Sequence, residues 1–290
     1  MIEPMLAKEY REDYVELPYY LQPKLNGHRA VWDGYKLWSR NGKEIISVPG
    51  LINQLSTYFL GKPVDGELFC PSMSLQEITK VVRRTVNIQD DPQICLYIYD
   101  IPIENVKYKD RLDIITTEYA DIIDKNHCNR MKILESVEYD RLIKHLNIFG
   151  AEYEGTMLRN SSGLYESGKR SSQLLKIKKF HDMEATITGV EQYYTYEKVL
   201  VAPNTPGSTK RKDGTWVKDG EATAHKMVGA FICKLHNGIE FKVGSGLNNK
   251  MRKEYWKNPP IGQVLTFKYQ DLTDEGVPSF PIFLQMREDI

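Results

Sequence analysis

Apolar and polar residues in the first two thirds of the chain follow two different periods. The runs HRAVW and YKLWS alternate on either side of Asp33-Gly34, a dipeptide typical of tight turns, and together they predict a β-hairpin. The runs LINQLSTYFL and SLQEITKVVRR have the apolar spacing of amphipathic helices. Ser74, followed three residues later by Glu77, predicts a capping box at the start of the second helix.

Further apolar runs in this part of the chain predict buried strands: PVDGELFC, QICLYIYDI, YEGTMLR and QLLKIKKF. Strands interspersed with helices in this way predict a mixed sheet with helices on its faces.

After about His181 the pattern changes to short strand-like runs separated by Gly, Pro and Asn: EATITGVEQYY, MVGAFICKL, IEFKVG and QVLTFKYQDL. One weak helix candidate, NNKMRKEYW, and a polar segment expected to be a loop, PNTPGSTKRKDGTWVKDGEAT, lie among them. This rhythm predicts a β-barrel of roughly five strands, the size of an OB-fold. We therefore expect an α+β chain of two domains, residues 1–181 and 182–290.

Composition supports an ordinary globular protein. The chain has 290 residues, of which 41% are hydrophobic, enough for a substantial core and about two domains. It has no apolar run of the roughly 18 residues that span a bilayer, and MIEPMLAKEYRED does not resemble a signal peptide, so we expect a cytoplasmic protein that does not bind membranes. The four cysteines lie too far apart for C-x-x-C zinc sites, which predicts reduced thiols.

The net charge is zero, from 39 basic and 39 acidic residues, and gives no support for a nucleic-acid-binding protein. Local charge differs from the average. The segment SGKRSSQLLKIKKFH contains no acid, and a second basic cluster lies in STKRKDG. Either cluster alone is more often a solvated face. As a pair they provide candidate DNA-binding residues: Lys169, Arg170, Lys210, Arg211 and Lys212.

The segment QPKLNGHRA places Lys24 just before a Leu-Asn-Gly turn. Most lysines are solvated surface amines, so this position alone indicates nothing more. A nucleophilic lysine must lose its proton, which requires burial, neighbouring cations or a metal to lower its pKa. Strand-like segments offer carboxylates of the kind that bind Mg²⁺, namely Asp65, Glu67 and Glu154.

Cations suited to a phosphoryl group are also available: Arg29, Arg40, Arg159, Lys176 and Lys178. Because Lys176 and Lys178 are two residues apart on a predicted strand, their side chains share one face and can hold one phosphate together.

In their order along the chain, these segments resemble the covalent nucleotidyltransferase superfamily, and within it the ATP-dependent DNA ligases. KLNGHR approaches the K-x-D-G-x-R motif of that family. The further matching segments are SRNG, DGE, YIYD, EGTMLR, LLKIK, FKVGSGL with Arg252, MLAKEY near the start, and FPIFLQMREDI, which resembles a closing R-x-D element. The resemblance covers essentially the whole chain.

The resemblance implies an adenylyltransferase domain of antiparallel sheets flanked by helices, followed by an OB-fold domain. It also implies that Lys24 attacks the α-phosphate of ATP, that AMP passes to the 5′-phosphate of a nicked strand, and that the 3′-hydroxyl then displaces AMP. Phosphoryl transfer of this kind is catalysed mainly by alignment and charge neutralisation. The implied cofactors and partners are ATP as co-substrate, Mg²⁺ with Mn²⁺ as an alternative, and nicked duplex DNA, bound by a monomer.

Residue roles follow from the same resemblance. Tyr99 stacks on adenine, Glu67 bonds the ribose, Glu154 binds the metal with Asp65 as a weaker ligand, and Lys176 and Lys178 hold the AMP phosphate. The implied ATP-binding set is Gln22, Lys24, Arg29, Arg40, Glu67, Tyr99, Arg159, Lys176 and Lys178.

Further roles concern DNA and pyrophosphate. Arg29 and Arg40 receive the 5′-phosphate of the nick, and Arg159 supports the nucleotide pocket. Arg287 and Asp289 orient pyrophosphate when the barrel closes over ATP.

Two positions depart from the family pattern. Asn26 stands where most relatives have Asp, which removes a negative charge; the amide oxygen still accepts a hydrogen bond, so we expect activity with an altered pH optimum. The sequence ends Arg-Glu-Asp-Ile, where relatives usually continue with a lysine, and we expect this to affect self-adenylylation more than sealing.

Several related classes are alternatives. An mRNA-capping guanylyltransferase shares the lysine motif, but SRNG and the arginine that ends EGTMLR favour a ligase. An RNA ligase typically lacks the C-terminal barrel, and an NAD-dependent ligase would need a further N-terminal module and zinc cysteines. A non-catalytic OB-fold nucleic-acid-binding protein would leave Lys24 inert.

Overall fold

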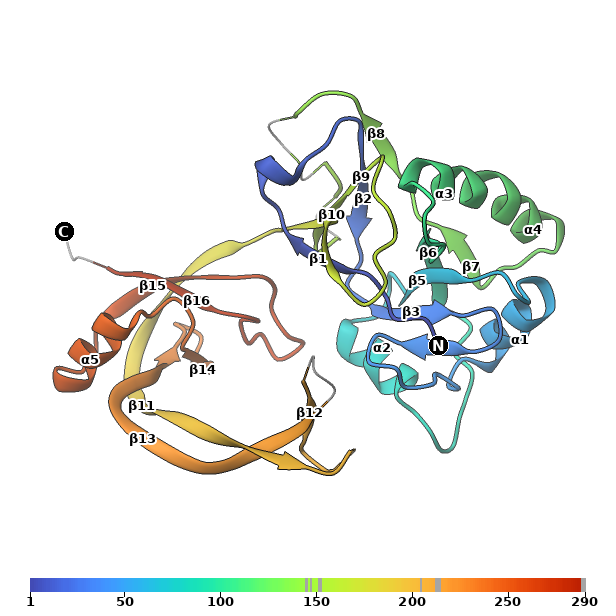
Figure 1. The fold of residues 1–290 in the computed structure, drawn as a ribbon. Helices are drawn as coiled ribbons and strands as arrows, with labels where there is room; N and C mark the ends of the chain where they lie inside the picture. The colour runs from blue at the N-terminus through green and yellow to red at the C-terminus, as the bar shows by residue number, and fades with distance from the viewer. Residues whose placement is uncertain (144–145, 147, 151–152, 204, 212–214, 288–290) are drawn as a thin grey trace. The chain divides into compact units, whose positions relative to one another are not determined.

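The computed structural model describes the chain except residues 144–145, 147, 151–152, 204, 212–214 and 288–290. The chain divides into two compact units, Met1–Lys179 and Phe180–Ile290 (Figure 1). Among the described residues, none of the helices combines the length and the apolar character needed to cross a bilayer.

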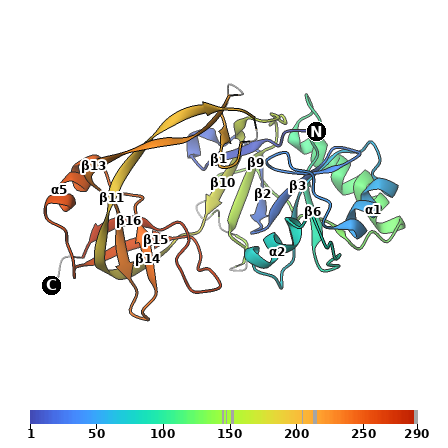
Figure 2. The same cartoon turned by 90° about the horizontal axis from the view of Figure 1, so that it is seen from below.

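The first unit contains two five-stranded sheets, ordered β1-β10-β9-β2-β8 and β4-β3-β5-β6-β7. Figure 2 shows β1, β10, β9 and β2 side by side in one layer, next to β3 and β6 of the other. The pairs β1–β10 and β6–β7 are parallel and the other neighbours are antiparallel. The strands are β1 (Leu6–Glu9), β2 (Tyr19–Lys24), β3 (His28–Trp32), β4 (Leu37–Ser39), β5 (Val64–Phe69), β6 (Cys95–Asp100), β7 (Met131–Ile133), β8 (Val137–Tyr139), β9 (Gly155–Asn160) and β10 (Arg170–Lys178).

The helices of this unit are α1 (Pro49–Tyr58), α2 (Leu75–Val82), α3 (Tyr108–Ile114) and α4 (Ala120–Lys125), with a 3₁₀ turn at Glu12–Tyr14 and a π-helical turn, Ile115–Tyr119, between α3 and α4. The sequence predicts α1, α2 and the β3–β4 hairpin. The capping box is present, because Ser74 Oγ accepts from the Glu77 backbone N–H and the Glu77 carboxylate accepts from the Ser74 N–H.

Side-chain alternation gives the second sheet one apolar and one polar face. Ala30 and Trp32 of β3 are buried in a core that includes Leu51 and Leu55 of α1. Strand residues of opposite parity, such as Arg29, therefore point to the other face. That face also carries the polar residues Asp65 and Glu67 of β5 and Tyr99 of β6.

The first sheet likewise has one apolar and one polar face. Leu21, Leu158 and Leu175 form a buried cluster on one side of β2, β9 and β10. The alternate positions on these strands carry Gln22, Lys24, Arg159, Lys176 and Lys178. Gln22 Nε2 donates to the Tyr99 carbonyl oxygen at 3.2 Å, so the polar faces of the two sheets meet.

The second unit is an antiparallel sheet ordered β12-β13-β11-β15-β16, with β14 paired to β13. Its core includes Phe231, Val243, Leu265 and Phe267. The elements are β11 (His181–Val201), β12 (Thr209–Lys210), β13 (Trp216–Lys234), β14 (Glu240–Val243), β15 (Val264–Tyr269), β16 (Ile282–Met286) and α5 (Asn249–Lys257), which confirms the predicted helix.

The polar segment 203–223, expected to be a loop, is in part a strand. From Trp216 onward it belongs to β13, which pairs with the end of β11 from Lys198↔Asp219 to Val201↔Trp216. Side chains on this two-stranded ribbon, such as those of Tyr196 and Leu200, are exposed. Val217 is buried, but most of the other side chains on the ribbon are exposed, so no regular apolar alternation marks these strands.

Candidate active site

Strand register brings two lysines and one glutamate together. Lys24 at the end of β2 and Lys178 at the end of β10 both pair with Gly155, the first residue of β9. The Glu154 backbone N–H donates to the Lys24 carbonyl oxygen at 3.0 Å. A Cβ at Gly155 would lie 2.1 Å from the Ile177 carbonyl oxygen, so this close approach of backbones requires glycine.

The Glu154 carboxylate lies between the two ammonium groups. Lys24 Nζ donates to Oε2, and Lys178 Nζ lies 3.1 Å from Oε1. The Lys24 and Lys178 side chains are 21% and 17% exposed, so they are largely removed from water but accessible to a ligand. Burial raises the pKa of Glu154, but Lys24 and Lys178 outweigh burial and hold that pKa below its ordinary value. The glutamate is therefore ionised at neutral pH.

Lys176 shares a face with Lys178, as the two-residue spacing predicts. Its ammonium group pairs with Glu9 Oε1 at 2.8 Å. The Glu9 side chain is 70% exposed, and exposed ion pairs contribute little to stability. An anion entering the site can therefore replace Glu9 as the partner of Lys176 at small cost.

Arg29 and Asp65 form a bidentate pair on the polar face of the second sheet. Arg29 Nε donates to Oδ1 at 2.9 Å and Nη2 donates to Oδ2 at 2.5 Å. Nη1 donates to the Met5 carbonyl oxygen at 2.5 Å. Burial lowers the pKa of Arg29, but Asp65 outweighs burial and holds that pKa well above its ordinary value. Both oxygens of the fully buried Asp65 are thus engaged.

Glu67 is a partly buried carboxylate close to Lys24 and Arg29. Burial raises its pKa to about 7, against the lowering effect of these two cations. Gly27 permits this approach, because a Cβ there would lie 2.9 Å from Glu67 Cγ and 2.4 Å from the Leu68 carbonyl oxygen. The turn after Lys24 can therefore lie directly against β5.

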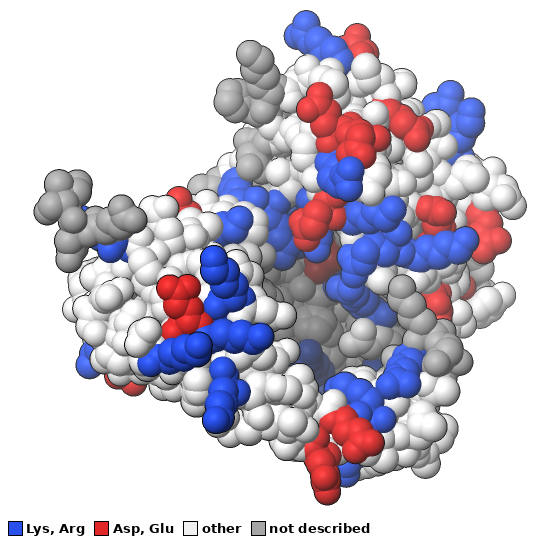
Figure 3. Space-filling model, turned by 60° about the vertical axis from the view of Figure 1, so that its left-hand side comes forward, with Lys and Arg blue, Asp and Glu red and all other residues white. Residues whose placement is uncertain are grey.

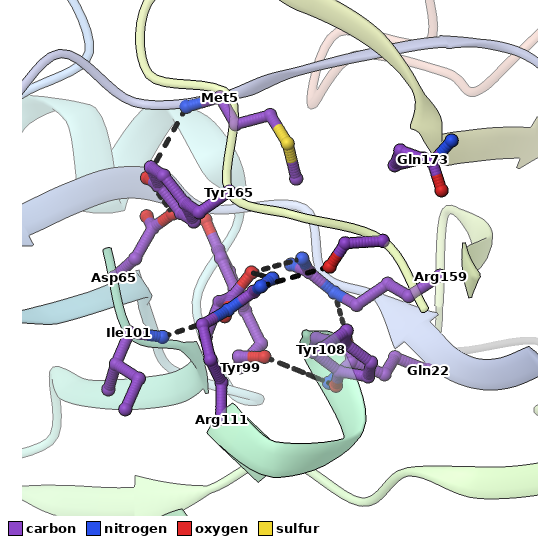
Figure 4. Close-up of polar contacts among 12 residues, drawn as sticks. Met5, Gln22, Asp65, Tyr99, Ile101, Tyr108, Arg111, Arg159, Tyr165 and Gln173 are labelled. Atoms are coloured by element: carbon purple, nitrogen blue, oxygen red, sulfur yellow. Dashed lines mark hydrogen bonds and ion pairs between the residues drawn. The ribbon is translucent and has the colours of Figure 1, made fainter. Parts of the chain in front are cut away.

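Two guanidinium groups lie close to the Tyr99 ring. The Cζ atoms of Arg29 and Arg159 are 5.7 Å and 5.2 Å from its centroid, within cation–π distance. Arg159 Nη1 donates to Asp100 Oδ2 at 2.6 Å, and its Nε donates to Gln22 Oε1 at 2.7 Å. Gln22 is 1% exposed, and Figure 4 shows it among these polar side chains.

Three other predicted site residues are exposed on the surface of the first unit. Arg40 is exposed in the turn after β4, and Lys169 and Arg170 are exposed where β10 begins. Arg170 Nη1 donates to the Ala7 carbonyl oxygen at 2.5 Å. These three side chains remain candidates for contacts outside the nucleotide pocket.

The remaining predicted residues belong to the second unit. Lys210 is in β12, Arg211 is exposed, and Arg287 pairs with Glu184. The predicted residues Lys212 and Asp289 lie outside the described residues. Figure 3 shows Lys and Arg side chains in several groups on the viewed face, with Asp and Glu side chains beside them.

Arg111 and Tyr165 are among the buried residues of this polar cluster that sequence reasoning missed. Arg111 of α3 is 1% exposed, and its Nε and Nη2 donate to the two oxygens of Asp100 at 2.7 Å and 3.0 Å. Tyr165, in the loop before β10, donates to Asp65 Oδ2 at 2.8 Å. An arginine in line with apolar residues of a helix was the only sequence signal for Arg111, and Tyr165 had none.

Two facing polar sheets with a lysine–glutamate–lysine group, followed along the chain by an antiparallel β unit, define a nucleotidyltransferase with an appended OB-like domain. The sequence model of the "ATP dependent DNA ligase domain" matches residues 4–178, more than half of the chain, and that of the "DNA ligase OB-like domain" matches residues 219–287. The chain belongs to the ATP-dependent DNA ligase family. It is a DNA ligase that uses ATP and acts on DNA, as the sequence predicts.

Similar proteins agree with this membership. A DNA ligase of Haemophilus influenzae is 28% identical over 292 residues, which span 96% of this chain and 90% of that protein. A DNA ligase of African swine fever virus is 29% identical over 327 residues, spanning 100% of this chain and 70% of that protein.

Solved structures show the same fold. A Lig E DNA ligase has a TM-score of 0.73 at 22% identity, with 99% of this chain and 100% of that chain covered. The ATP-dependent DNA ligase of bacteriophage T7 in complex with ATP has a TM-score of 0.52 at 15% identity, with 98% of each chain covered. At such identities the likeness concerns the fold alone.

Proposed function

We propose that this ligase seals nicks between a 3′-hydroxyl and a 5′-phosphate in duplex DNA, and that Lys24 is its nucleophile. The observation that carries the proposal is the group of Lys24, Glu154 and Lys178, which strand register brings together. The charge of Lys24 also acts on Glu67 of the other sheet. Lys24 Nζ attacks the α-phosphorus of ATP, a P–N bond forms, and pyrophosphate leaves. The proton of Lys24 leaves along its hydrogen bond to Glu154 or to water.

The next two transfers use the same site. A 5′-phosphate oxygen of the nick attacks the phosphorus of lysyl-AMP, the P–N bond breaks, and Lys24 is restored. The 3′-hydroxyl then attacks the 5′-phosphate and AMP leaves. Lys176 and Lys178 neutralise phosphate charge during these steps, since stabilising developing charge is the main contribution a protein makes to phosphoryl transfer.

We assign the adenosine pocket to Tyr99 and Glu67. The Tyr99 ring provides a face for the adenine base, and Glu67 provides a carboxyl group for the ribose hydroxyls. Arg159 and Gln22 hold this pocket in shape. Both side chains are nearly fully buried and hydrogen-bonded to other protein groups.

Mg²⁺ fits one of the two predicted carboxylates. The described residues contain no group of three or more His, Cys, Asp or Glu side chains arranged to hold a metal, but Mg²⁺ often takes only one or two carboxylates and completes its shell with water and phosphate oxygens. Glu154 meets this need, because Lys24 and Lys178, which pair with its two oxygens, are partly exposed side chains that can turn to the phosphates of ATP. Asp65 does not, because Arg29 and Tyr165 occupy its oxygens. When bound, the ion would neutralise phosphate charge.

We assign the 5′-phosphate of the nick to Arg29 and Arg40. More distant phosphates would contact the basic clusters: Lys169, Arg170, Lys210, Arg211 and Lys212. Arg287 and Asp289 would orient pyrophosphate. The predicted division at residues 181 and 182, the monomeric state and the cytoplasmic location stay predictions.

Labelling with ATP tests the nucleophile. The protein is incubated with α-labelled ATP and Mg²⁺, denatured, and examined for covalent label. Lys24→Arg keeps a cation beside Glu154 but cannot form the adenylate at neutral pH, so we expect no label. Lys36→Arg is the matched control, because Lys36 is an exposed lysine paired with Glu44 in the same unit, and it should label fully. Full labelling of Lys24→Arg would disprove the assignment.

A further inference from the structure

Tyr165 occupies a central place in the buried polar cluster, although it is not among the predicted site residues. Its side chain is 4% exposed and lies between Met5 and Asp65 (Figure 4). The hydroxyl donates to Asp65 Oδ2 at 2.8 Å and accepts from the Met5 backbone N–H at 3.3 Å.

These contacts close a ring of hydrogen bonds that includes Arg29. Tyr165 donates to Asp65, Arg29 donates to both oxygens of Asp65, Arg29 also donates to the Met5 carbonyl oxygen, and the Met5 N–H donates to Tyr165. The ring joins four segments that are distant in sequence: the residue before β1, strand β3, strand β5 and the loop before β10. Each member is held by two others.

The ring determines how much freedom Arg29 has. Asp65 is fully buried, and Tyr165 is its partner besides Arg29. Three N–H groups of Arg29 donate within the ring, and the others have no acceptor in the described parts of the chain. The Arg29 side chain is 14% exposed, so it is not fully closed off from a ligand. The remaining N–H groups of Arg29 point in a fixed direction as long as Asp65 stays in place.

We propose that Tyr165 is a positioning residue for Arg29: its hydroxyl fixes Asp65, and Asp65 fixes the guanidinium in the orientation that receives the 5′-phosphate of the nick. This inference rests on the proposed role of Arg29. It also makes the backbone of Met5 part of the arrangement. The competing interpretation is that the ring only stabilises the first unit, in which case Tyr165 affects unfolding and not the sealing step.

Sealing of 5′-adenylylated nicked DNA without ATP isolates the last chemical step. Tyr165→Phe removes only the hydroxyl, and Tyr119→Phe is its matched control. Tyr119 is also buried, and its hydroxyl donates to the Pro63 carbonyl oxygen at 3.2 Å, outside the ring. Single-turnover rates are measured for both variants, each alone and combined with Arg29→Ala, together with the melting temperature.

We expect Tyr165→Phe to slow sealing about tenfold, the effect of losing one hydrogen bond to a charged group. We expect Tyr119→Phe to seal within about twofold of the wild type, at a similar melting temperature to Tyr165→Phe. In the Arg29→Ala background, Tyr165→Phe should cause no further loss, since coupled residues are not additive.

Two outcomes overturn the inference: sealing by Tyr165→Phe at the rate of Tyr119→Phe, or an equal loss in the presence and absence of Arg29. Different results would contradict the proposed function. Arg29→Ala sealing at the wild-type rate would remove the role of Arg29, and covalent label on Lys24→Arg would remove the nucleophile.

Discussion

The raised pKa of Glu67 predicts that the stability of the folded chain depends on pH, and that Glu67→Gln removes this dependence. Burial raises this pKa from 4.5 to about 7. Between these pH values the folded chain holds a proton that the unfolded chain has released. By linkage, the free energy of unfolding then falls as pH rises, because the folded state binds more protons. The stabilising contribution is complete below pH 4.5 and is lost as pH rises through about 7.

The size of the effect follows from the shift. At about 1.4 kcal/mol per pKa unit, the difference between 4.5 and about 7 corresponds to roughly 3 kcal/mol as an upper bound. Glu67 is partly exposed, and solvent screening reduces this to about 1 to 2 kcal/mol. Glu67→Gln does not titrate, so the wild type should lose this amount relative to the variant between pH 5 and pH 8.

Urea unfolding of the first unit at several pH values measures this difference. Glu44→Gln is the control, because Glu44 is an exposed glutamate paired with Lys36, and its substitution should change the free energy of unfolding by less than about 1 kcal/mol. A difference between Glu67→Gln and wild type that stays constant from pH 5 to pH 8 would refute the reasoning, because it would mean that Glu67 does not titrate in this range.

Three further predictions concern the site and its DNA contacts. Glu154→Gln should slow lysyl-AMP formation about 100-fold, measured with labelled ATP, because the ammonium groups of Lys24 and Lys178 lose the carboxylate charge that lies between them. Because the pKa of Glu154 is lowered in the folded chain, its contribution to the free energy of unfolding is lost as pH falls. Gly155→Ala should reduce the free energy of unfolding by about 2 kcal/mol or more, measured with urea, because its Cβ would meet the Ile177 carbonyl oxygen; unchanged stability would contradict the close strand approach. Binding of nicked DNA, measured by fluorescence anisotropy, should weaken about 1,000-fold between about 50 and 200 mM salt, and indifference to salt would argue against phosphate contacts.

The sequence predicted those elements whose signals are local. The β3–β4 hairpin, α1, and α2 with its Ser74 capping box depend on turn residues, spacing and caps within a few residues of each other. It did not predict α3 and α4, because the segment from 108 to 125 is interrupted by a π-helical turn and buries the charged side chain of Arg111. The end of β11 and the start of β13 were missed because most of their side chains are exposed, which removes the regular apolar alternation that marks a strand.

The site residues were predicted as a set, but their partners were not. Motif order selected Lys24, Glu154 and Lys178, and strand register brings them together. That Asp65 is bound to Arg29 depends on the pairing of β3 with β5, a contact between distant segments that residue types cannot determine. From the D-G-E triplet alone, Asp65 is as suitable for binding a metal as for pairing with an arginine.

The shared register of β2, β9 and β10 at Gly155 also links chemistry to folding. Lys24 of β2, Lys178 of β10 and Glu154, the residue before β9, meet only when all three strands are aligned, and a slip of one residue would turn side chains to the opposite face. Under the proposal that Lys24 is the nucleophile, a chain that has not assembled this sheet would not consume ATP. Covalently bound AMP would therefore mark folded molecules and report the maturation of newly made enzyme.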